Sequence, residues 1–195
     1  MVGRKPEFDH EAVLKGAMAT FWEHGYEAAS MADLLNATGL SKSSLYAGFG
    51  GKHDLFVESY DLYRRKRADL LKRTMESTPA PGGIRAFFED IITGGTDDLQ
   101  RFGCMTTNQA AEMAAQDDMI SSRVQEDYQL LEDAFTEHIK SGQQNGTVPG
   151  SIDALATASA LVTAFSGFQL AVRANMDRAR LRRALEYFMA PLQLP

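Results

Sequence analysis

The chain has little of what stabilises secreted proteins or spans membranes. One cysteine among 195 residues excludes an intramolecular disulfide and suits a reducing cytoplasm, which is the expected location. No run of eighteen uninterrupted apolar residues is present to cross a bilayer. The first residues, Met1 to Pro6, lead into an acidic polar run rather than the apolar region of a signal peptide. The sequence therefore predicts no membrane partner.

The motifs that mark common enzyme classes are also missing. The chain has no Gly-x-Ser-x-Gly, no P-loop and no dinucleotide glycine fingerprint, and its histidines, His10, His24, His53 and His138, are far apart. We therefore predict that the protein is not an enzyme and holds no metal or cofactor. The alternatives are an enzyme of unfamiliar type or an all-helical protein that binds small molecules but not DNA.

Negative charge is missing from one segment near the N-terminus. No Asp or Glu occurs from Leu34 to His53, although the whole chain has 26 acidic and 20 basic residues. Residues 1–76 carry eleven of each sign, whereas residues 77–195 carry nine bases against fifteen acids. A DNA duplex would meet no repulsion at 34–53, while the acidic remainder is an unfavourable nucleic-acid surface.

The same segment predicts two short helices joined by a tight turn. Ser30 is a good N-cap for a helix starting at Met31, and Asp33 completes a capping box. Gly39 follows that helix at the position where a residue in the left-handed backbone conformation commonly ends a helix. Ser41 then caps the next helix, whose first turn is Lys42, Ser43 and Ser44. The N-terminal residues of such a second helix are the ones that read the major groove.

These residues carry a family resemblance. Thr38-Gly39-Leu40-Ser41-Lys42, followed by Leu45-Tyr46, Phe49 and Lys52, resembles the signature of TetR-type transcriptional regulators. The resemblance implies that Tyr46 and Lys52 hold the DNA backbone and that the turn Lys42 to Ser44 lies at the bases. Ala47 and Gly48 depart from the bulkier residues often found there. An ordinary helical corner is the alternative interpretation of the pattern.

The position of Lys52 supports a DNA contact on physical grounds. A cation at the start of a helix opposes the helix dipole, and a phosphate bound at that helix end would offset this. The predicted DNA-contacting residues are Ser30, Ser41, Lys42, Ser43, Ser44, Tyr46 and Lys52. The basic arm Gly3-Arg4-Lys5 is either a minor-groove contact or a solvated terminus.

Helical periodicity extends over the rest of the chain, so the predicted fold is all-α: a three-helix head with a helix-turn-helix, followed by a helical body. A first helix is capped by Asp9, and a long one runs from Gly51 to about Ser77, where Pro and Gly in 78–83 break the pattern. The further helices are expected at Ile84–Thr93, Cys104–Ala115, Met119–Ser141, from Asp153, and around Leu181 to Phe188. We assign residues 7–67 to DNA binding and 68–195 to effector binding and dimerisation.

The last two helices are unusually apolar for a monomer surface. Exposed apolar patches mark interfaces, and the pair resembles the closing helices of TetR-type proteins, which form a four-helix bundle across a twofold axis. We therefore expect a homodimer, with Phe165 and Leu185 inside the interface. The alternative is that both helices serve only the core of one chain.

An effector site is expected inside the body. Apolar walls with a few polar groups suit a small molecule, and the predicted residues are Phe87, Phe88, Ile91, Cys104, Asn108, Gln109, Glu112, Tyr128 and Phe165. At the start of a helix, N–H groups would favour the Cys104 thiolate, so a reactive thiol is an alternative to reversible binding, and plain core packing is another. The resemblance implies a repressor that leaves its double-stranded DNA operator when the effector binds.

Overall fold

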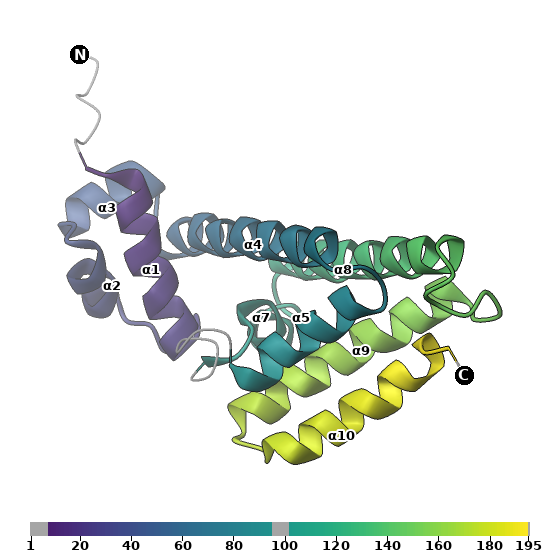
Figure 1. Cartoon of the computed structure of the whole chain (residues 1–195). Coiled ribbons are helices and arrows are strands. Elements are labelled where there is room, and N and C mark those ends of the chain that lie inside the picture. The colour runs from purple at the N-terminus through teal and green to yellow at the C-terminus, as the bar shows by residue number, and fades with distance from the viewer. Residues whose placement is uncertain (1–7, 95–101, 195) are drawn as a thin grey trace.

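The computed structural model describes residues 8–94 and 102–194. Every regular element in these ranges is helical, as predicted (Figure 1). The basic arm at residues 3–5 lies outside the described residues. Three helices, α1 (His10–His24), α2 (Met31–Thr38) and α3 (Lys42–Phe49), form a head at one end of the molecule, and the remaining helices form the body (Figure 1).

The head helices begin and end at the residues that the sequence indicates. The Asp9 side chain accepts hydrogen bonds from Glu11 N and Ala12 N, and Ser30 and Asp33 form the predicted capping box. Gly39 has φ 68°, which only glycine adopts without strain, and this sharp end of α2 allows α3 to start at once. Ala17, Phe21, Leu34, Leu45 and Phe56 are buried and form the shared core of the head and the start of α4.

Helix α4 (Lys52–Ser77) joins the two parts and crosses residues 67 and 68 without interruption. It runs from the head along the upper edge of the body in Figure 1, where it packs against α8 (Asp118–Gln144). A displacement of α4 in the body is therefore carried to the head by a continuous helix.

The body packs α5 (Gly82–Thr93), α7 (Met105–Glu112), α8, α9 (Ala154–Arg173) and α10 (Arg178–Met189), followed by a short 3-10 turn, η1 (Ala190–Leu192). Helix α7 ends three residues earlier than predicted, because the chain turns at Met113, whose N–H still bonds to Gln109 O. Helix α8 continues to Gln144, since the Gln143 amide donates to the carbonyls of Pro149 and Ile152 and fixes the following loop.

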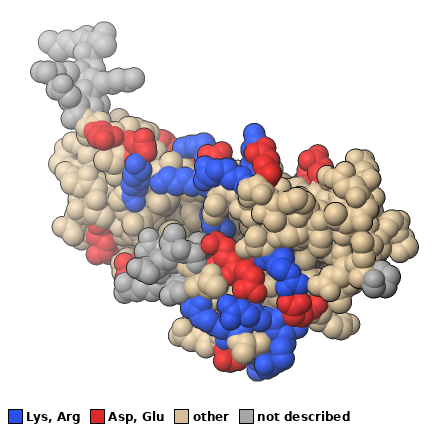
Figure 2. Space-filling view, viewed as in Figure 1, with Lys and Arg blue, Asp and Glu red and all other residues tan. Residues whose placement is uncertain are grey.

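Arginines tie α10 to its neighbour α5. Figure 2 shows Lys and Arg gathered on the lower edge of the body, where α10 lies in the same view. Arg178 donates to Ile92 O at 2.6 Å, and Arg182 donates to Glu89 at 3.1 Å. Leu181, Leu185 and Met189 face inward and are buried.

The expected interface positions of Phe165 and Leu185 are corrected by this packing. Leu185 is fully buried and Phe165 is 5% exposed within the single chain, so both belong to its core. Helix α9 is long and apolar enough to cross a bilayer by length and composition, but the core helix of a soluble protein passes the same test, and α9 packs on α8, α5 and α10. In the most apolar 18-residue stretch of α9, 33% is buried within the single chain.

Candidate DNA-binding surface and effector cavity

The first turn of α3 presents a small, hydroxyl-rich surface. Ser41 accepts a hydrogen bond from Ser44 N at 3.1 Å, and its Oγ lies 2.9 Å from Ser43 Oγ and 2.8 Å from Ser44 Oγ. Lys42 and Ser43 are exposed, whereas Leu45 and Phe49 anchor the other side of α3 in the core. The structure thus brings the three predicted base-reading residues together on one exposed helical turn.

The two residues expected at the DNA backbone flank this turn differently. Tyr46 is 48% exposed. Lys52 already has partners in the head: its Nζ lies 4.6 Å from the centre of the Tyr26 ring and 3.3 Å from Glu27 O. These contacts offset part of the unfavourable helix-dipole term, so a phosphate is not required to explain Lys52. An ammonium group has three donors, which leaves donors for a phosphate.

Ser30 contributes to the head mainly through its cap. Its hydroxyl donates to Asp33 Oδ2 at 2.6 Å and accepts from Asp33 N at 3.1 Å. The hydrogen bonds from Ser30 lower the pKa of Asp33. A DNA contact from the Ser30 hydroxyl would compete with these bonds.

The body contains a small cavity at the place where α4 meets α8. It has a volume of about 60 Å³ and is lined by Arg64, Arg67, Ala68, Leu71, Phe87, Cys104, Thr106, Asp127, Tyr128, Leu130, Leu131 and Phe165. Phe87, Cys104, Tyr128 and Phe165 were predicted from the sequence to lie here. Sites for drug-sized ligands have roughly 300–1,000 Å³, so a ligand beyond a few atoms must move the walls apart.

The other predicted effector residues lie elsewhere. Phe88 and Ile91 are buried in the core behind Phe87. Gln109 is also buried, and its amide has no hydrogen-bond partner among the residues that the structure describes. Asn108 donates to Phe102 O and accepts from Arg173, and together with Glu112 it lines a different groove, between α1 and the body. Cys104 and Glu112 were predicted to share one site because they are close in sequence, but they contact different parts of the protein.

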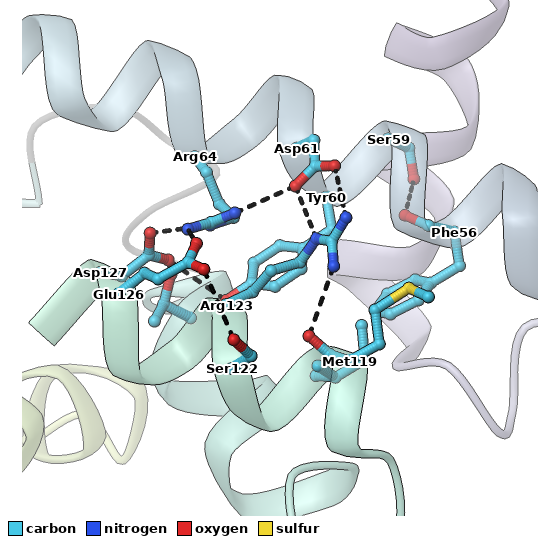
Figure 3. A network of polar contacts seen from close by, with 12 residues as sticks. Phe56, Ser59, Tyr60, Asp61, Arg64, Met119, Ser122, Arg123, Glu126 and Asp127 are labelled. Atoms are coloured by element: carbon cyan, nitrogen blue, oxygen red, sulfur yellow. Dashed lines mark hydrogen bonds and ion pairs between the residues drawn. The ribbon is translucent and has the colours of Figure 1, made fainter.

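Figure 3 shows a polar network that the sequence analysis missed, and two of its members, Arg64 and Asp127, line the cavity. Arg64 lies between three carboxylates: its nitrogens are 2.7 Å from Asp127, 2.7 Å from Glu126 and 3.1 Å from Asp61. Asp127 also accepts from Thr106 at 2.8 Å. The network therefore ties α4 to both α7 and α8.

Arg123 and Tyr60 also belong to this network. Burial acts to raise the pKa of Asp61, but the hydrogen bonds from Arg123 and Arg64 outweigh it, so that pKa is lowered. The Tyr60 hydroxyl donates to Asp127 at 3.3 Å, and burial raises the pKa of Tyr60. In the sequence run Arg64-Arg65-Lys66-Arg67, Arg65 and Lys66 are exposed, whereas Arg64 points into the protein.

Cys104 lines the cavity. It is the N-cap residue of α7 and is 3% exposed, and its Sγ accepts a hydrogen bond from the Tyr63 hydroxyl at 3.4 Å. Burial raises the pKa of Tyr63, which keeps that hydroxyl protonated and able to donate. The cysteine is therefore both packed and in contact with the cavity.

Head and body are joined by a set of contacts that we call the clasp: Trp22–Gly103, Glu27–Glu112 and His53–Asp117. Trp22 Nε1 donates to Gly103 O at 2.8 Å, and Glu27 N donates to the Glu112 carboxylate at 2.9 Å. His53 Nε2 lies 2.7 Å from Asp117 Oδ2, and this hydrogen bond lowers the pKa of Asp117. Gly103 precedes the cavity residue Cys104, so the clasp begins at the cavity wall.

A compact three-helix head with an exposed recognition turn, joined by α4 to a body that is helical in its described residues and holds a small cavity, defines a helix-turn-helix regulator. Comparisons give the family. Residues 13–58 match the profile described as bacterial regulatory proteins, tetR family, and residues 80–188 match the one described as Tetracyclin repressor-like, C-terminal domain. The chain belongs to the TetR family of transcriptional regulators.

Related proteins match this chain along nearly its whole length. The uncharacterized regulator YezE of Bacillus subtilis (strain 168) is 32% identical over 91% of this chain and 93% of its own length. The repressor ComR of Escherichia coli (strain K12) is 28% identical over 92% and 86%. The solved structure of the regulator CifR, a cysteine mutant with operator DNA, superposes with a TM-score of 0.83 at 24% identity, covering 96% and 98%.

Proposed function

We propose that the protein is a homodimeric, cytoplasmic repressor rather than an enzyme, and that a small molecule bound in the body releases it from its operator. Residues 7–67 contain the DNA-binding head and the start of α4. Residues 68–195 bind the second copy and, together with Arg64 and Arg67, the effector. The observation that carries this proposal is the course of α4. Its first residue, Lys52, comes just after the end of the recognition helix α3 at Phe49, and its later residues Arg64, Arg67, Ala68 and Leu71 line the cavity.

The route from effector to DNA follows from these contacts. The cavity of about 60 Å³ is too small for most organic ligands, so binding separates α4 from α8 and α9. That displacement moves the head directly through α4. It also disturbs the clasp, because the Trp22 side chain donates a hydrogen bond to the carbonyl of Gly103, the residue before Cys104. An effector that binds this expanded form more tightly shifts the population away from the DNA-binding form.

The dimer is supported by an exposed stripe on α9. Ala156, Ala160, Thr163, Gly167 and Leu170 recur at alternating spacings of four and three and are all exposed. On the last helix, α10, Tyr187 is 80% exposed. A Cβ at Gly167 would have no heavy atom within 4 Å. Small residues on one stripe allow a second helix to approach closely, so a second copy of the chain is the expected cover.

DNA contacts are proposed for the exposed side chains of the recognition turn and its flanks. Lys42, Ser43 and Ser44 meet base edges, while Tyr46 and Lys52 meet phosphates. Ser30 and Ser41 act at the N-termini of α2 and α3, where backbone N–H groups favour a phosphate. The family membership and the relatives named as repressors support this assignment.

Selection of genomic fragments by the purified protein tests the function. Fragments enriched at low salt should share a near-palindromic sequence, because a twofold dimer presents two recognition helices to half-sites about one turn apart. Titration of the best fragment should then give specific affinity that a scrambled duplex lacks. Retention of every fragment in proportion to its length, or of none, would contradict a sequence-specific repressor.

A further inference from the structure

The charged residues that line the cavity fall into two groups. Arg64 and Asp127 form an ion pair at 2.7 Å, and each has further partners, Glu126 and Asp61 for Arg64 and Thr106 for Asp127. Their charges and hydrogen-bonding groups are thus satisfied inside the protein. A ligand gains little from either side chain, since it would have to break existing bonds.

Arg67 is different. It lies one turn after Arg64 on α4, lines the same cavity and is half-buried. Among the residues that the structure describes, no carboxylate forms an ion pair with it and no group accepts a hydrogen bond from it. Burial raises the pKa of Tyr63 and the charge of Arg67 opposes that rise, so the guanidinium acts close to the Tyr63 hydroxyl and hence to Cys104.

A second donor faces the same space from α8. Tyr128 lines the cavity, and its hydroxyl accepts a hydrogen bond from Ser166 at 3.1 Å, which leaves its own hydrogen for another acceptor. Most of the remaining wall is apolar, from Leu71, Phe87, Leu131 and Phe165. The cavity therefore offers one cation and one hydroxyl donor in otherwise apolar surroundings.

We propose that the effector is a small carboxylic acid, bound as its carboxylate by Arg67 and Tyr128, with its apolar part against Leu71, Phe87 and Phe165. This inference rests on the proposed function, which makes the cavity the effector site. A planar guanidinium fits a carboxylate with two parallel hydrogen bonds. Asp127 would repel a dianionic phosphate more strongly than a singly charged carboxylate, and Arg67 would repel an amine.

The entrance for such a ligand is also defined. Two open grooves between α4 and α8, of about 530 and 440 Å³, share Ala68 and Leu130 with the cavity. Leu130 is 45% exposed, and the small side chain of Ala68 lines the same cavity and both grooves. A ligand that enters here meets Arg67 on the neighbouring position of α4.

Matched ligand pairs test the charge assignment. Straight-chain, branched and aromatic monocarboxylic acids of about four to ten carbons are each compared with their primary amides, which have the same shape but no charge. Calorimetry at pH 7 measures their affinity for the full-length wild type, Arg67→Gln, Arg67→Lys and the control Arg73→Gln. Arg73 is exposed on the same helix and lines none of the described cavities.

At least one acid should bind the wild type about 10- to 100-fold more tightly than its amide, as expected for a charge-assisted hydrogen-bonded pair. Arg67→Gln should abolish that preference, Arg67→Lys should retain part of it, and Arg73→Gln should leave it unchanged. Thermal unfolding of the variants without ligand shows whether each is folded. Equal binding of acids and amides, or binding of no acid in the series, overturns the inference.

Operator titrations on the same proteins separate this result from the proposed function. If the protein binds no DNA sequence specifically but still prefers acids through Arg67, the regulatory function fails and the ligand assignment stands. If the protein binds an operator and is released by a neutral or cationic compound in an Arg67-independent way, the ligand assignment fails alone.

Discussion

The ion pair between Arg64 and Asp127 should be essential for the stability of the body. Both side chains are only 18% exposed. In Asp127→Ala, Arg64 keeps Glu126 and Asp61, but Thr106 and Tyr60 lose their acceptor. Breaking a buried ion pair costs about 3–5 kcal/mol. Because Arg64 retains two carboxylates, we expect a loss of about 2–4 kcal/mol of unfolding free energy.

A double-mutant cycle isolates the pair. Arg64→Met keeps the apolar stem but leaves Asp127 without its cation, so it should also be strongly destabilising. The double variant should be more stable than the sum of the two single effects by about 1–3 kcal/mol. Urea unfolding followed by circular dichroism, at one fixed protein concentration, gives the free energies by linear extrapolation.

A bidentate pair on the surface provides the control. Arg85 contacts both oxygens of Glu186, which is 56% exposed. Water and salt screen such a pair, so Glu186→Ala should lower the urea midpoint much less than Asp127→Ala does. Additive effects of Arg64→Met and Asp127→Ala, within about 0.5 kcal/mol, would show that the two side chains do not act as a unit.

Four further outcomes follow from the structure. Lys52→Ala should weaken binding to specific and random duplexes alike and reduce the salt slope by about one contact, whereas Ser43→Ala should change sequence preference; an unchanged slope removes Lys52 from the phosphate contacts. Gly167→Trp should give a folded monomer by light scattering, and an unaltered mass would place the interface elsewhere. In Asp117→Asn the N-cap is kept but the charge facing His53 is lost. The pKa of Asp117 is lower in the folded protein than in the unfolded chain, so the ionised carboxylate stabilises the fold above the unfolded pKa, and this stabilisation is lost as the pH falls below about 4. The urea unfolding midpoints of wild type and Asp117→Asn should therefore converge towards pH 3. A difference that stays constant with pH counts against the His53 contact. Cys104→Ser should still release operator on effector addition, with no mass change in the wild type; a variant that stays bound would favour thiol modification instead.

The elements that sequence reasoning placed correctly depend on local chemistry. Asp9, Ser30, Ser41 and Asp153 each accept a hydrogen bond from the first turn of the helix that follows. Such a bond joins residues two or three positions apart, so it can be recognised without knowing the rest of the fold. The recognition turn was found for the same reason.

What sequence reasoning missed depends on distant partners. Arg64 and Asp127 are 63 positions apart, and nothing in either neighbourhood indicates the pairing. Glu112 has the spacing of a cavity residue on α7, yet it faces the head, because the turn at Gly25 approaches that end of the helix. The apolar stripe containing Leu185 was a correct sign of burial, but a stripe alone does not tell whether its own chain or a second copy covers it.

The clasp restricts how freely heads and bodies of related regulators can be exchanged. A Cβ at Gly25 would lie 2.8 Å from Glu112 Oε2, and Gly25 has φ 81°, so the turn and the carboxylate fit only as a pair. Trp22 and the Gly103 carbonyl form a second matched pair. A chimera that takes its head from one relative and its body from another will fold on each side of α4. It will keep the route through α4 but lose the route through the clasp unless both pairs come from one parent, so these residues should be transplanted together when a biosensor is built from this scaffold.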